Sequence, residues 1–85
     1  MDQEMTFSLS YEQLTRFAEQ RIRECKLDSE GLAYMTASTE AATVLGFWYE
    51  LAINGYASMN AITRKALIDA DHLRLRKLIW PETDK

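Results

Sequence analysis

The sequence predicts an all-α protein, folded as a compact bundle of three main helices. Three segments repeat apolar residues at intervals of three and four positions, as helices that bury one face do. Only three Gly and one Pro occur in 85 residues, which leaves little turn chemistry for the hairpins of an all-β fold. A chain of this length forms one domain. We therefore expect a single helical domain over residues 10–80, with an N-terminal extension (1–9) and a C-terminal tail (81–85).

The first helix carries the clearest start signal in the chain. Ser10 is a favoured N-cap residue, and Gln13 at the third helical position completes a capping box. Charged residues occupy the face opposite the apolar stripe, so we expect an amphipathic helix of about four turns, ended by the polar segment 28–31. The apolar stripe consists of Tyr11, Leu14, Phe17, Ala18, Ile22 and Cys25.

The second helix is expected to begin between residues 36 and 39, with Ser38 as its cap. The apolar residues before it, Leu32–Met35, fit either a short extra helix near residues 30–35 or an extended linker. Asn54-Gly55 is a good C-terminal stop signal.

The second helix also holds an unusual concentration of apolar residues. Glu50 is the only charged residue between 41 and 54, so we expect burial on more than one side. Three consecutive aromatic residues, Phe47 to Tyr49, span about 200° of a helix, so they cannot all face one core. Trp and Tyr are frequent in interface hot spots, which makes this segment the sharpest sign of a protein partner.

The third helix is expected to start near Ser58 or Asn60 and to end before Pro81. It has two apolar faces, and a helix of this kind must pack against two separate surfaces. Either it breaks near residues 69–71, or the second face belongs to a partner. A third interpretation is a strand over His72–Leu78, where Leu and Arg alternate. The first face is Ile62, Ala66, Ala70, Leu73 and Trp80, and the second is Leu67, Ile68, Leu75, Leu78 and Ile79.

Composition excludes several classes of protein. The net charge of −3 and the pI of about 5.0 are unlike those of a chain that coats nucleic acid. One Cys and one His cannot build a disulfide framework or a zinc site within one chain, so we expect no metal and no cofactor. No apolar run approaches the roughly 20 residues of a membrane span, and the acidic start lacks the features of a signal peptide. We expect a cytoplasmic protein with no membrane partner.

Nothing in the sequence indicates catalysis. His72 stands in no recognisable catalytic motif, and the three glycines are isolated rather than grouped in a phosphate-binding loop. A chain this short buries only about 60–65% of its unfolded surface, so a partner would add needed stability. We expect a non-catalytic protein-binding module that regulates or inhibits a larger cytoplasmic protein, such as an accessory inhibitor of bacteria or phages, and a homodimer is one form of association. The expected contacts are Phe47, Tyr49, Leu75, Ile79 and Trp80, with charged contacts from Arg64, Arg74, Arg76 and Lys77.

The charge distribution leaves two further interpretations open. Residues 1–60 carry four basic and nine acidic side chains, whereas residues 61–85 carry six and four. These halves could attract each other in self-association, or both could be solvated surfaces. The alternative function is DNA binding by a helix-turn-helix formed around Asn54-Gly55, although the whole chain is acidic. Base contacts would then come from Ser58, Asn60, Thr63 and Arg64, and phosphate contacts from Arg64, Lys65, Arg74, Arg76 and Lys77.

Overall fold

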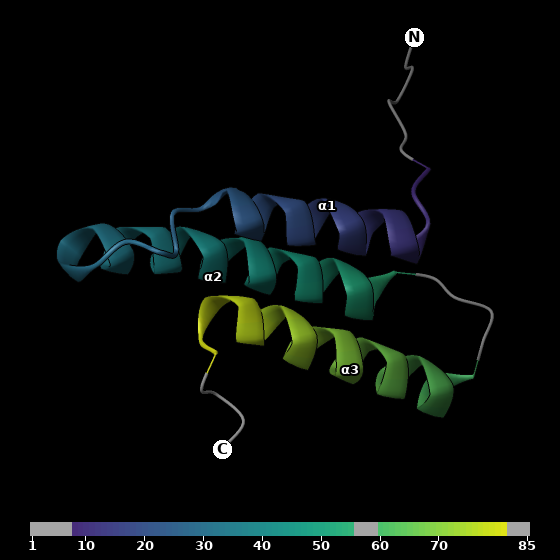
Figure 1. Cartoon of the computed structure of the whole chain (residues 1–85). Helices are drawn as coiled ribbons and strands as arrows, with labels where there is room; N and C mark the ends of the chain where they lie inside the picture. Colours follow the sequence, from purple (N-terminus) through teal and green to yellow (C-terminus); the bar gives the residue numbers. More distant parts are fainter. Residues whose placement is uncertain (1–7, 56–59, 82–85) are drawn as a thin grey trace, which may run out of the picture.

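The computed structural model describes residues 8–55 and 60–81, which form three helices. These are α1 (Tyr11–Glu24), α2 (Gly31–Asn54) and α3 (Ala61–Ile79). Successive helices run in opposite directions, and each contacts both of the others (Figure 1). The prediction of an all-α three-helix bundle is confirmed. The described residues contain no strand, so the interpretation of residues 72–78 as a strand is wrong.

Helix α1 begins as the sequence predicts. The Ser10 hydroxyl accepts a hydrogen bond from the backbone N–H of Gln13, and the Gln13 side chain accepts one from the backbone N–H of Ser10, both at 3.0 Å. The helix ends at Glu24, where the N–H of Cys25 bonds to the carbonyl of Ile22. Its end therefore comes before the polar segment 28–31 that the sequence suggests.

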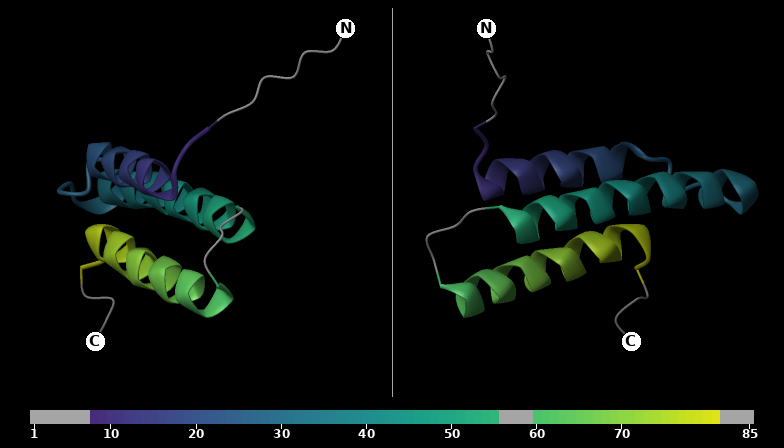
Figure 2. Two further views of the ribbon diagram at one scale, coloured as in Figure 1. Left: turned by 90° about the vertical axis from the view of Figure 1, so that its right-hand side faces the viewer. Right: turned by 180° about the vertical axis from the view of Figure 1, so that it is seen from behind.

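Helix α2 begins at Gly31, five residues or more before the predicted start at residues 36–39. Residues 30–35 are thus neither a separate helix nor a linker, because they lead directly into one continuous helix. Ser38 is not a cap: its hydroxyl donates to the carbonyl of Met35 at 3.1 Å, inside the helix. Gly31 has a φ of 63°, a conformation that side chains disfavour, and it turns the chain into α2. The first turns of α2 project beyond both neighbours (Figure 2).

Helix α3 runs unbroken through residues 69–71. The Asn60 side chain accepts a hydrogen bond from the N–H of Thr63 at 2.8 Å and caps the helix. The predicted alternative start at Ser58 lies outside the described residues. Leu75 and Ile79 are fully buried, so assigning their face to a partner was wrong. Both apolar faces have helical periodicity, and periodicity alone does not tell which one turns inward.

The core lies along the line where the three helices meet. Its largest side chain is Trp48, which is 1% exposed and belongs to the central helix α2. Four of the buried residues are alanines, whose small side chains allow close helix packing: Ala18 of α1 and Ala37, Ala41 and Ala52 of α2. The core residues are Ala18, Ile22, Ala41, Leu45, Trp48, Ala52, Ile68, Leu75 and Ile79.

Candidate functional site

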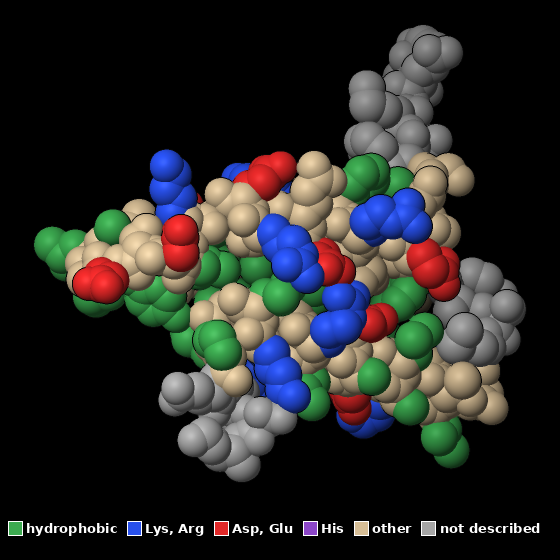
Figure 3. Space-filling model, in the orientation of Figure 1, with side chains coloured by type: hydrophobic (Ala, Val, Ile, Leu, Met, Phe, Trp, Pro, Cys, Tyr) green, Lys and Arg blue, Asp and Glu red, His purple; other side chains and the backbone are tan. Residues whose placement is uncertain are grey.

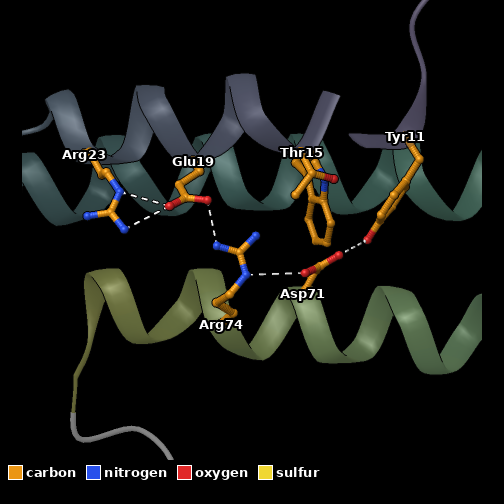
Figure 4. Close-up of polar contacts among 7 residues, drawn as sticks. Tyr11, Thr15, Glu19, Arg23, Asp71 and Arg74 are labelled. Carbon is orange, nitrogen blue, oxygen red and sulfur yellow. Dashed lines mark hydrogen bonds and ion pairs between the residues drawn. The ribbon is translucent and has the colours of Figure 1, made fainter. Parts of the chain in front are cut away.

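A chain of polar contacts joins α1 to α3 (Figure 4). Arg74 of α3 donates to Glu19 of α1 at 2.6 Å, and Glu19 also accepts from Arg23 at 2.9 Å. Asp71 accepts from the Tyr11 hydroxyl at 2.7 Å and from Arg74 at 3.4 Å. Arg74, which the sequence suggests for partner contacts, thus bonds to carboxylates within its own bundle, and its side chain remains 47% exposed. An open pocket of about 290 Å³ lies over this network.

The ionisation of these groups suits a structural role. Burial, with a contribution from Asp71, raises the pKa of Tyr11 above its ordinary range, so its hydroxyl remains a proton donor. Hydrogen bonds from Arg74 and Arg23 lower the pKa of Glu19, so it remains a carboxylate. General acid–base catalysis is most effective when the pKa lies near the working pH. Both shifts move the pKa values of these two groups further from neutral pH.

His72 packs against the aromatic side chains of α2. Its ring lies parallel to Trp48 with centroids 6.2 Å apart, and it meets Tyr49 at 4.9 Å. Burial, and then the positive charge of Arg76, lower the pKa of His72. Tyr49 is thus half-buried between helices, although the sequence suggests it for a partner. The described residues contain no group of three or more side chains that could hold a metal ion.

Two phenylalanines point away from α3, one from each of the other helices. Two residues correspond to about 200° of an α-helix. Glu19 and Tyr49 both reach side chains of α3, so Phe17 and Phe47, each two positions earlier, lie on the opposite sides of their helices. The hydrogen bond from the Trp48 indole to Thr15, at 3.0 Å, aligns α1 with α2 and places the two phenylalanines at nearly the same level.

We call these two phenylalanines and Leu51, which are exposed on the sides of α1 and α2 turned away from α3, the phenylalanine face. Phe17, Phe47 and Leu51 are 55%, 63% and 41% exposed. Leu51 lies one turn after Phe47 on the same side of α2. The sequence identifies Phe47 but places Phe17 in the apolar stripe of the first helix and Leu51 in the segment 41–54, which is expected to be buried on more than one side. No local pattern marks them, because their exposure follows from Glu19 and Tyr49 facing α3, which only tertiary packing decides.

A second apolar surface runs along the outside of α3. Ile62, Leu73 and Trp80 are 83%, 39% and 37% exposed. They belong to the first apolar face of this helix, of which the sequence suggests only Trp80 for a partner, beside Leu75 and Ile79 of the second face. The projecting end of α2 also exposes Leu32 and Met35. By contrast, the side where α1 and α3 meet mixes Lys and Arg with Asp and Glu (Figure 3).

The basic residues suggested for partner or DNA contacts differ in their surroundings. Arg64 and Arg76 are half-buried, Lys77 is exposed, and Arg74 is bonded to Glu19 and Asp71. Helices α2 and α3 lie side by side and antiparallel (Figure 1), whereas those of a helix-turn-helix unit cross at about 90–120°. The geometry therefore favours the apolar surfaces over the basic residues as the candidate site.

In comparisons with known proteins, no family model, curated protein or solved structure matches the chain. In the described part of the chain, no helix has the length and apolar character needed to cross a bilayer.

Proposed function

We propose that this protein is a small non-catalytic binding module that regulates or inhibits a larger cytoplasmic protein through the phenylalanine face. The observation that supports the proposal is the exposure of Phe47 in the middle of the central helix. A large aromatic side chain in that position contributes little to its own fold. Fully burying such a side chain against a partner is worth about 1.5–3 kcal/mol.

The surroundings of the phenylalanine face define the partner's chemistry. Glu24 lies two turns after Phe17, and Glu40 lies two turns before Phe47, so in this antiparallel pair both carboxylates lie at the same end of the face. Arg21 is the basic residue nearby, and it pairs with Glu24 at 3.2 Å. The proposed target therefore presents an apolar groove or helix with basic residues at one end, because opposite charges around an interface steer association. Occupying that groove would exclude the target's other ligands.

The test is affinity capture from nuclease-treated lysate of the source cells with matched variants. We expect the wild-type chain and Ile62→Ser to retain the same single protein in stoichiometric amount, and Phe47→Ser to lose it. Ile62 is the appropriate control because it is even more exposed than Phe47 but lies on α3. With the purified target, Phe47→Ser should weaken binding about thirtyfold or more, as loss of an interface hot spot does.

Two outcomes would contradict the proposal. Retention of the target by Phe47→Ser, with helicity unchanged, would move the binding site elsewhere. Recovery of DNA but no protein when nuclease is omitted would favour the helix-turn-helix alternative, and steep salt dependence would then be expected.

A further inference from the structure

The outer surface of α3 has the residue spacing of a helix-pairing seam. Five exposed side chains and the half-buried Arg76 follow each other there at intervals of four, three, four, three and four positions, the heptad spacing with which helices pair. The inner side of α3 is already occupied, because Ile68, Leu75 and Ile79 fill the core. We call the outer set the α3 stripe, which consists of Ile62, Ala66, Asp69, Leu73, Arg76 and Trp80.

We propose that the α3 stripe binds the same stripe of a second copy of this chain, with the two α3 helices antiparallel about a two-fold axis. The charges along the stripe favour this occupant and this direction. Asp69 lies in the N-terminal half and Arg76 in the C-terminal half. A parallel pair would place Asp69 beside Asp69 and Arg76 beside Arg76, whereas an antiparallel pair brings unlike charges together.

The two-fold axis crosses the middle of the stripe. One layer then pairs Asp69 with Leu73 of the second copy, and the next pairs Ala66 with Arg76. The methyl group of Ala66 leaves room for the methylenes of Arg76, whose guanidinium reaches Asp69 one turn further on. At both ends Ile62 lies opposite Trp80, so the most exposed large apolar side chain of the stripe is covered by an aromatic ring.

The existing contacts of Asp69 are compatible with this arrangement. Asp69 pairs with Lys65 of its own helix at 2.7 Å, and the Asp69 side chain remains 51% exposed. An exposed pair of this kind contributes little to stability. A second cation from the partner copy can therefore approach the same carboxylate without breaking a contact that the fold needs.

This surface is separate from the one that carries the proposed function. Tyr49 of α2 reaches α3, and Phe47 lies on the opposite side of that helix, away from α3. A dimer through the α3 stripe would thus leave both phenylalanine faces free, and each assembly would present two copies of the binding surface to a target.

Light scattering of the full-length chain after size exclusion provides the first test. We expect a mass that rises with concentration from the 9.8 kDa monomer toward twice that value. Leu73→Asp places a carboxylate opposite Asp69 and should weaken dimerisation about tenfold or more. Phe47→Asp makes the same chemical change on the phenylalanine face and should leave the dimer intact. Far-ultraviolet circular dichroism should show unchanged helicity in both variants.

A charge exchange then identifies the second copy as the partner. Asp69→Arg alone and Arg76→Glu alone should each dimerise poorly, because each leaves like charges facing each other. Mixed together, the two variants should form a heterodimer, and the double variant D69R/R76E should recover self-association.

Several results would overturn the proposal. These are a wild-type monomer at about 100 µM, a dimer unaffected by Leu73→Asp, or single variants that fail to pair when mixed. A monomeric wild-type chain that loses a captured protein on Leu73→Asp, but not on Phe47→Asp, would show that a different protein covers the stripe. That result would also contradict the proposed function, whereas the loss of dimers alone would not.

Discussion

Trp48 of the central helix α2 contacts both of the other helices. Its indole N–H donates to Thr15 of α1, and its ring stacks on His72 of α3. Thr15 is a buried polar residue, and the bond to Trp48 satisfies both side chains without water. One aromatic side chain on the central helix therefore sets the register of both outer helices.

The contribution of the Trp48–Thr15 hydrogen bond to stability can be measured with the variant Thr15→Val. Valine has a similar shape but no acceptor, so the buried indole N–H is left without a partner. We expect a loss of about 1–3 kcal/mol in the free energy of unfolding, the cost of an unsatisfied buried donor. Urea denaturation measures it. Thr43→Val is the control, since Thr43 is exposed and bonds within its own helix. Equal stability of the two variants would show that the bond does not matter.

At the scale of the helices, α1 and α2 are capped differently at their N-termini. Ser10 and Gln13 exchange hydrogen bonds at the start of α1. At the start of α2, Glu30 makes no side-chain capping bond. Helix α2 therefore owes its first turns to the positive φ of Gly31 and to tertiary contacts, among them the Tyr34 hydroxyl, which donates to the carbonyl of Ile79 at 2.8 Å.

Two serine variants separate a real cap from a serine that resembles one. Ser10→Ala should destabilise the protein by about 1 kcal/mol, because it leaves an N-terminal N–H of α1 without its acceptor. Ser38→Ala should change stability by less than about 0.5 kcal/mol, because the Ser38 hydroxyl bonds back to Met35 inside a formed helix. Thermal unfolding of the two variants and the wild type gives both values. A larger loss for Ser38→Ala would mean that α2 begins at residue 38 in solution.

The helices that sequence reasoning placed well are those with a local signal. The start of α1 follows from Ser10 and Gln13, whose bonds are three residues apart and can be read directly. The start of α2 could not be found in this way, because Glu30 is not a favoured cap and Leu32 and Met35 are exposed. These two exposed apolar residues add nothing to a buried stripe. Tyr34 and the buried Ala37 do extend the stripe of Ala41 and Leu45 toward the first turns, but they are a weak signal beside Leu32 and Met35.

At the scale of the whole molecule, the sequence specifies how many apolar faces exist but not which of them meet. Helix α3 has two such faces, and only tertiary packing selects that of Leu75 and Ile79 for the core. The polar bridge from Arg74 to Glu19 joins residues 55 positions apart, a separation at which no local pattern signals a contact. The exposure of Phe47 could be predicted because three consecutive aromatic residues cannot all face one core. Phe17 has no such neighbours, so its exposure depends on tertiary packing alone.

The stability of the whole bundle should depend on pH through His72 and Glu19. The pKa of His72 is lowered in the folded state, mainly by burial, so the unfolded chain binds the proton more readily. Stability is then fully present above the unfolded pKa of about 6.5 and falls as the pH decreases toward the folded pKa. The lowered pKa of Glu19 adds a second loss, which begins as the pH falls below about 4.5. Urea denaturation at a series of pH values measures both stages. His72→Gln should abolish the first stage and keep the second, whereas a first stage that persists in this variant would assign it to another group.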